Sequence, residues 1–222
     1  TRTLISLNSD FSPRNIQPFG QKGKSRHISF VAQSGFSNPV ILFPRYTETE
    51  LGGVRTIRLM KFQGEDATPI EIYAGQDRVL PGLPFIDSDP SGRLLILTIA
   101  KSTTGIFERT VLLRLSESGL DAHDIELNEI PGAARSALLT PDNHLLVVAR
   151  RDQGAYLAYK YDLEGKLLWV SQAIPTLNGQ TLRTLTIDES HETLFFFHDV
   201  AQEQDEYART IARVDAFGTA AV

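Results

Sequence analysis

The 222-residue chain contains no cysteine, one methionine and one tryptophan. The absence of cysteine excludes a disulfide-stapled scaffold, a zinc site with thiolate ligands and a thiol nucleophile. It does not assign a compartment, because both cytosolic and exported proteins can lack cysteine. The 41% hydrophobic and 22% charged residues are ordinary for a globular chain and exclude a disordered one.

Long hydrophobic runs are also absent. The longest, 94–100 and 194–197, are far shorter than the roughly 20 residues of a membrane-spanning helix, so we expect no membrane span in this segment. The chain begins without an initiator methionine and without the apolar stretch of a signal peptide. We interpret it as a processed product or as part of a larger polypeptide, and we leave its compartment open between periplasm and cytoplasm. The net charge of −5 argues against general nucleic-acid binding.

Two sequence patterns recur at a spacing of about 50 residues, which is the period of a repeat architecture. An Arg-Thr pair opens an alternating segment at Arg2, Arg55, Arg109 and Arg209, and residues 156–161 (YLAYKY) share that phase without the pair. In step with them, short apolar runs occur at 40–43, 94–97, 145–148 and 194–197. These runs predict strands that are buried on both faces.

Each period therefore holds an inner strand, a buried apolar strand, an Arg-Thr strand and an outer strand such as 70–73 or 167–170. We expect the inner strands near Ser29, Phe85, Leu138 and Leu182. Four short antiparallel strands repeated in this way are typical of β-propeller blades. We predict an all-β chain, a single β-propeller or propeller fragment of about four blades. The blade periods are approximately 20–74, 75–130, 131–178 and 179–222, with 1–19 closing the ring or belonging to a neighbouring blade.

One repeat has a family likeness. Residues 139–148 (LTPDNHLLVV) and then 159–166 (YKYDLEGK) resemble the blade repeat of TolB-like and NHL-like propellers. In that repeat a Pro-Asp-Gly turn precedes an apolar strand and an Asp-x-x-Gly turn closes the next strand, whereas this chain has Asn143 and His144 in place of the first glycine. Gly165 and Trp169 also resemble the Gly-x-x-x-Trp of quinone-type propeller repeats, which implies a ring docked between blades. The resemblance implies a superfamily of folds that carries many functions.

Two segments near the ends of the chain raise separate questions. Residues 200–209 are rich in helix formers, but the repeat phase predicts a loop followed by a strand there. Both ends carry third-strand sequences, and an exposed sheet edge invites pairing. We therefore expect a segment within 2–19 to pair with the last blade around 209–215.

The classical chemical motifs are absent or incomplete. Residues 87–92 (DSDPSG) resemble the start of a calcium loop, but Thr98 stands where an EF-hand needs a bidentate glutamate, so we interpret them as a turn. His191 and His198 are an odd number of residues apart, so in a strand they point to opposite faces, and we do not expect them to bind the same metal ion.

The sequence has no nucleophile elbow, phosphate loop or dinucleotide motif. We expect no catalytic residue, no metal and no cofactor.

Polar residues in or beside the inner strands are the candidates for binding. Arg135 and Arg183 lie in expected inner strands, which line the central channel of a propeller. The turns that follow inner strands, or the residues beside them, contain aspartates. We predict that the ligand-binding residues are Asp87, Arg135, Asp142, Arg183 and Asp188.

The function that these features favour is a non-catalytic binding or scaffolding module. It would present a propeller face and the interblade loops to a protein partner, because binding residues concentrate on loops that a rigid scaffold positions. The alternative is a hydrolase or lactonase-like enzyme with a metal in the central channel, held by Asp87, Asp142, Asp188 and Glu192. A third hypothesis is the sensor domain of a larger receptor or regulator.

Overall fold

The computed structural model describes residues 2–7, 13–19, 30–32, 40–47, 54–63, 68–75, 78–79, 85–101, 107–116, 121–130, 134–151, 155–174, 180–187, 193–199, 209–215 and 218–221. Every regular element in these ranges is a β-strand, and they are numbered β1 to β19. The predicted all-β fold class is confirmed. The described ranges contain no helix that is long and apolar enough to cross a membrane.

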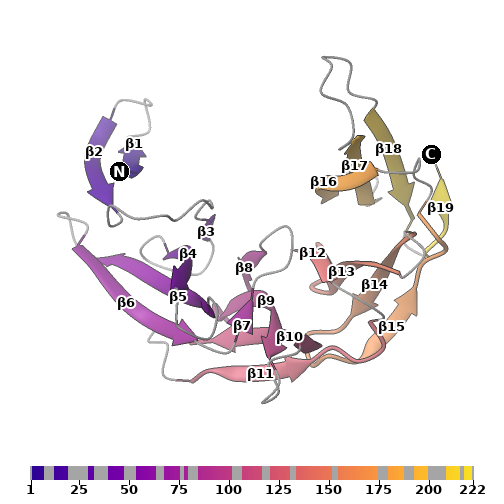
Figure 1. The fold of residues 1–222 in the computed structure, drawn as a ribbon, viewed down its shortest axis with the longest axis horizontal. Coiled ribbons are helices and arrows are strands. Elements are labelled where there is room, and N and C mark those ends of the chain that lie inside the picture. The colour runs from indigo at the N-terminus through magenta and orange to yellow at the C-terminus, as the bar shows by residue number, and fades with distance from the viewer. Residues whose placement is uncertain are drawn as a thin grey trace.

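Most strands belong to four successive antiparallel sheets (Figure 1). The first sheet has the order β3 (Phe30–Ala32), β4 (Val40–Thr47), β5 (Val54–Gln63) and β6 (Thr68–Gly75). In the second, β7 (Arg78–Val79) and β8 (Ile86–Ser88) both pair with β9 (Leu94–Lys101), which is followed by β10 (Phe107–Leu115) and β11 (His123–Glu126).

The third and fourth sheets repeat the same up-and-down order. The third consists of β12 (Ala134–Leu139), β13 (Leu145–Arg150), β14 (Tyr156–Tyr161) and β15 (Leu167–Val170). The fourth consists of β16 (Gln180–Ile187), β17 (Thr193–Asp199), β18 (Arg209–Val214) and β19 (Ala220–Ala221). In Figure 1 the first strands β3, β8, β12 and β16 lie on the inner side of an arc, and the last strands β6, β11, β15 and β19 lie on its outer side.

The sequence repeats correspond to strands at fixed places in these sheets. The apolar runs fall in β4, β9, β13 and β17, each of which is paired with the first strand of its sheet. The Arg-Thr pairs at 55, 109 and 209 fall in β5, β10 and β18, which come next in order. The strand predicted from Arg209 onward is confirmed, while residues 200–208 lie outside the described ranges.

The predicted pairing between the two ends of the chain is wrong. The strand β1 (Arg2–Leu7) pairs with β2 (Pro13–Phe19), with Ile5 opposite Ile16. The strand β18 pairs with β17 on one edge and with β19 on the other. A neighbouring partner closes a much shorter loop than one about 200 residues away, and loop-closure entropy favours the shorter loop.

The core lies between consecutive sheets. Alternate residues of β13 point to opposite faces, and the side chains of 145–149 are all at most 1% exposed. Leu145 and Val147 pack with Leu95 and Leu97 of the second sheet. On the other face, the residues that pack with Phe195 of the fourth sheet are Leu146 and Val148.

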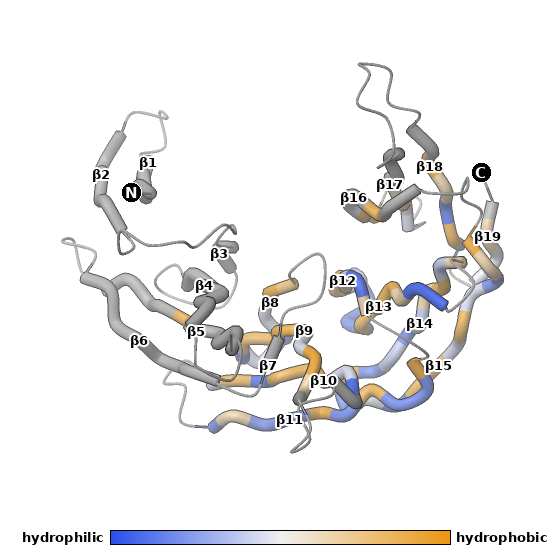
Figure 2. The backbone as a smooth tube through the Cα atoms, viewed as in Figure 1, coloured by the Kyte–Doolittle hydropathy of each residue, from blue (hydrophilic) through white to orange (hydrophobic). Residues whose placement is uncertain are grey.

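Burial of the predicted core is therefore confirmed for Leu95, Leu97, Leu146, Val148 and Phe195, whereas the side chain of Phe197 lies outside the described part. Figure 2 shows the hydrophobic stretch of β9 near the middle of the arc.

Candidate functional site

The turn between β12 and β13 is held by backbone bonds across residues 140–144. The Thr140 N–H donates to the His144 carbonyl oxygen at 2.8 Å, and the Asn143 N–H donates to the Thr140 carbonyl oxygen at 2.9 Å. Asn143 has a φ of 59°, a left-handed conformation that asparagine adopts more readily than most residues. This explains how asparagine replaces the glycine of the repeat pattern.

Among the described residues, the Asp142 carboxylate accepts no backbone N–H of its own turn, and its contacts there are with the side chains of Thr140 and His144. In other turns an aspartate Oδ1 accepts backbone N–H groups: Asp162 accepts from Lys166 at 2.8 Å, and Asp215 accepts from Thr219 at 2.8 Å. In the β12–β13 turn the Thr140 hydroxyl takes that place and accepts the His144 N–H at 3.0 Å. The carboxylate of Asp142 is therefore available for side-chain partners.

Three side chains surround the Asp142 carboxylate. The Thr140 hydroxyl donates to Oδ1 at 2.5 Å, and Lys160 Nζ, from β14, donates to Oδ2 at 2.8 Å. His144 Nδ1 lies 2.9 Å from the same Oδ2. Burial alone would raise the pKa of Asp142, but the contacts with Lys160, Thr140 and His144 outweigh it and hold this pKa well below its ordinary value. The carboxylate therefore stays ionised at neutral pH.

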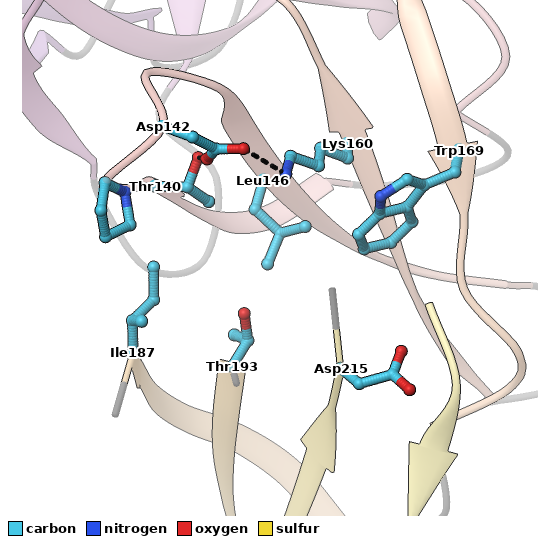
Figure 3. A pocket seen from close by; sticks show the side chains of 9 residues that line it. Thr140, Asp142, Leu146, Lys160, Trp169, Ile187, Thr193 and Asp215 are labelled. Carbon is cyan, nitrogen blue, oxygen red and sulfur yellow. Dashed lines mark hydrogen bonds and ion pairs between the residues drawn. The ribbon is translucent and has the colours of Figure 1, made fainter. Parts of the chain in front are cut away.

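This group forms one wall of a pocket between the third and fourth sheets (Figure 3). The pocket has a volume of about 360 Å³. Its lining comes from both sheets and consists of Thr140, Pro141, Asp142, Leu146, Lys160, Trp169, Ile187, Thr193 and Asp215. We call it the inter-sheet pocket. It combines an apolar floor with ionised groups, which is the usual composition of a ligand-binding site.

Trp169 enters the pocket because side chains alternate along β15. Leu168 and Val170 are each 42% exposed, while Trp169 is half-buried and packs with the core between the third and fourth sheets. The indole lies against Gly218, where an added Cβ would come within 3.3 Å of Cε3. Gly218 has a φ of +86°, and because it has no side chain, its backbone can approach the Trp169 ring closely.

The same type of contact occurs one sheet earlier. Gly165 has a φ of +88°, and an added Cβ would lie 2.6 Å from Ile125 Cγ2 on β11. The two glycines occupy equivalent Asp-x-x-Gly turns, in which the glycine N–H donates to the carbonyl oxygen of Asp162 or Asp215. The third-to-fourth-strand turn of one sheet thus packs on the last strand of the preceding sheet. Trp169 lies at such a boundary.

Three of the five predicted site residues have side chains within the described part of the chain. Asp142 lines the inter-sheet pocket, but Asp87 and Arg135 do not. Asp87 is on β8, where its Oδ1 accepts the Ser88 N–H at 2.8 Å, and Arg135 is half-buried on β12. The side chain of Arg183 and all of Asp188 lie outside the described residues. The binding role of these residues stays a prediction.

The calcium-like segment 87–92 forms a turn held by its own aspartate. Asp89 Oδ1 accepts the backbone N–H groups of Ser91 and Arg93, each at 2.9 Å, and the Ser91 hydroxyl at 2.6 Å. Within the described part of the chain, no group of three or more Asp, Glu, His or Cys side chains is placed to hold a metal ion.

Sequence reasoning missed several residues of the pocket. Lys160 is paired with Leu146 across the β13–β14 ladder, which brings its ammonium to the Asp142 turn. That pairing could have been found by folding 139–148 onto 159–166 as a hairpin. Thr193 and Asp215 belong to the next sheet, and no sequence signal places them opposite Asp142.

Comparison with known proteins gives likeness in fold alone. No family model matches the chain, and no curated protein matches it in sequence. A protein of unknown function from Dyadobacter fermentans DSM 18053 is similar in structure, with 13% identity and a TM-score of 0.57, over 87% of this chain and 66% of that chain.

Two further solved structures are less similar to this chain in structure. A xylan beta-1,4-xylosidase from Bacillus halodurans C-125 has 14% identity and a TM-score of 0.47, over 83% of this chain and 39% of its own. A protein of unknown function from Bacteroides caccae has 12% identity and a TM-score of 0.38, over 98% and 87%. The chain thus spans less than two thirds of the first two proteins, and these likenesses assign no activity.

Proposed function

We propose that this chain is a non-catalytic binding module built from propeller-type blades, which presents its inter-sheet turns to a protein partner. The repeated order of the sheets supports the blade interpretation, as do the contacts between consecutive inner strands, β3 with β8 and β12 with β16. Propeller blades are joined by turns on a rigid scaffold, and binding residues concentrate on such turns.

The observation that carries the proposal is the inter-sheet pocket. It opens among the turns of two sheets, and its walls combine the Trp169 indole, the Asp142–Lys160 ion pair and aliphatic side chains. Tryptophan is one of the residues most enriched at the hot spots of protein interfaces, and a charged pair beside it adds electrostatic specificity. A pocket of about 360 Å³ can accommodate one or two partner side chains.

The chemistry of Asp142 favours binding over catalysis. A general base works best when its pKa is near the working pH. Burial raises the pKa of Asp142, but hydrogen bonds from Lys160 and Thr140 together with the His144 contact hold it far below neutral, which makes it a weak base. The same carboxylate serves well as a fixed negative charge.

The test is selection of binding peptides from a random displayed library on the folded wild-type protein. Selected peptides are then titrated against Trp169→Ala and against Leu168→Ala as the matched control. Leu168 neighbours Trp169 on β15, yet it is 42% exposed and does not line the pocket. We expect Trp169→Ala to weaken binding at least tenfold, as truncating an interface anchor does, and Leu168→Ala to change it less than twofold.

Two results would contradict the proposal. One is a failure to enrich any peptide over a library selected on the unfolded chain. The other is an enriched peptide whose affinity is the same for wild type and Trp169→Ala, since the partner surface would then lie elsewhere.

A further inference from the structure

Arg135 interrupts the regular pairing of β12 with β13. Ala134 is opposite Ala149 in this ladder. The next paired residue is Ser136, opposite Val148, so Arg135 is an extra residue on β12. This is a β-bulge, and bulges bend a strand, re-aim a side chain and are over-represented beside active sites. Because β12 lies on the inner side of the arc (Figure 1), the bulge introduces an arginine there.

The same irregularity recurs in the next sheet. Arg183 is the extra residue of β16, because Leu182 and Thr184 are opposite consecutive residues of β17. The two arginines stand at the same distance from the ends of their strands, and β12 and β16 are neighbouring inner strands in contact. The side chain of Arg183 lies outside the described part, so only its register is used. Two consecutive repeats thus place an arginine at an equivalent bulge.

Arg135 also has a buried nitrogen without a partner. Within the described part of the chain, the buried side-chain nitrogens that lack a hydrogen-bond partner are Arg114 Nε, Arg135 Nε and His144 Nδ1. Arg114 Nε lies 3.5 Å from Asp89 Oδ2, and His144 Nδ1 lies 2.9 Å from Asp142 Oδ2. The Arg135 guanidinium has no such carboxylate among the described residues. An unsatisfied buried donor costs free energy, more so on a charged group, and so indicates a purpose other than stability.

We propose that Arg135 binds an oxyanion, the carboxylate or phosphate group of a ligand, on the inner side of the arc. The planar guanidinium presents its N–H groups in a fixed fork that matches two oxygens of such a group. The oxyanion accepts the Nε–H and compensates the charge. This site is separate from the inter-sheet pocket, which Arg135 does not line, and it goes beyond the proposed function.

The stability of the ligand-free protein is the first test, made in a buffer whose anion is chloride. Arg135→Met keeps the aliphatic stem and removes a charge that has no described partner, so the melting temperature should stay the same or rise. Arg114→Met is the matched control and should lower the melting temperature, because that guanidinium bonds to Leu163 and faces Asp89. An equal decrease in both variants would overturn the inference, since Arg135 would then serve the fold.

The second test measures binding directly. The probes are acetate, which carries a carboxylate alone, and inorganic phosphate, each titrated against chloride at constant ionic strength. The Arg135 Nε–H resonance in a ¹H–¹⁵N spectrum is identified by its absence from the spectrum of Arg135→Gln. We expect one or both probes to shift it saturably, and the tighter probe identifies the class of oxyanion.

Three variants separate the fork from the charge, with affinities measured on the backbone amide of Ser136. Arg135→Gln should abolish binding. Arg135→Lys keeps the charge without the fork and should weaken binding severalfold. Arg93→Gln makes the same change in net charge as Arg135→Gln at an exposed position and should leave the affinity unaltered.

Equal affinity in wild type and Arg135→Gln would show binding of an adventitious ion only and would overturn the inference. An Arg135 resonance that neither probe moves would also overturn it. Neither result affects the proposed function, which is tested separately through Trp169.

Discussion

Arg114 Nη2, on β10 of the second sheet, donates a hydrogen bond of 2.6 Å to the Leu163 carbonyl oxygen in the β14–β15 turn of the third sheet. Its Nε lies 3.5 Å from Asp89 Oδ2, and Asp89 in turn holds the β8–β9 turn through Oδ1. One guanidinium thus joins turns of two sheets. The contact joins segments 49 residues apart in sequence, close to the repeat period.

The first prediction concerns this Arg114 contact. Replacing Arg114 with methionine keeps the aliphatic stem and leaves the mostly buried Asp89 without its ion pair. We expect the free energy of unfolding to fall by about 1.5–3 kcal/mol, the range for hydrogen bonds to charged groups. Arg109→Met is the control, because the Arg109–Glu126 pair is about half exposed and should contribute less than about 1 kcal/mol. Urea unfolding followed by circular dichroism measures both, and equal effects would mean that Arg114 does not join the sheets.

A second prediction concerns Gly165. In Gly165→Ala, the alanine would have to adopt a φ of +88°. Its Cβ would lie only 3.0 Å from the Glu126 carbonyl oxygen and closer still to the Ile125 side chain. We expect a loss of more than about 1 kcal/mol in unfolding free energy, because the backbone conformation and the packing both oppose the side chain. Asn143→Gly, at a left-handed position in an exposed turn, should be nearly neutral. A thermal melt of each variant is sufficient, and a neutral Gly165→Ala would show that β11 does not approach the turn.

The pH dependence of stability tests the environment of Asp142. Its pKa in the folded protein lies below the ordinary 3.8, so its ionised form stabilises the fold above that pH. This contribution is lost as the pH falls below 3.8 toward the lower folded-state pKa. The difference in urea midpoint between wild type and Asp142→Asn should therefore be largest near neutral pH and should shrink between pH 4 and pH 2. A difference that grows on acidification would reverse the assigned direction.

Metal removal separates the binding module from the channel-metal enzyme. The aspartates of the described turns accept hydrogen bonds from their own backbones or, for Asp142, from Lys160 and Thr140. Treatment with a chelator should leave the melting temperature unchanged within about 1 °C, which is well below the shift that a tightly bound ligand gives. A large decrease that added Ca²⁺ or Zn²⁺ restores would favour the enzyme.

The repeats in the sequence predicted the strands well because each apolar run must be covered on both faces. Residues 145–149 show this most clearly, since their alternate side chains serve two different cores. The inner strand expected near Phe85 is divided into β7 and β8, which pair with β9 separately. Pro81 and Pro84 stand between them in sequence and have no N–H group to donate to a ladder.

The site was harder to predict than the fold. Asp142 could be selected from its turn, but its partners depend on which residue stabilises that turn, and Thr140 takes this role instead of the aspartate. The opposite wall depends on how neighbouring sheets pack, which the period alone does not specify. The expected pairing of a segment within 2–19 with the last sheet was wrong for a related reason: a shared phase identifies equivalent strands but does not choose their partners.

The central claim is that a partner peptide binds between the third and fourth sheets. Amide chemical shifts of the labelled protein, recorded during titration with a peptide selected on it, test this most directly. We predict that the largest chemical-shift changes fall at residues 140–144 and 215–219 and on the Trp169 indole. We expect little change at Leu168 or along β11. Shifts that cluster on the second sheet, with the Trp169 resonance unmoved at saturation, would contradict it.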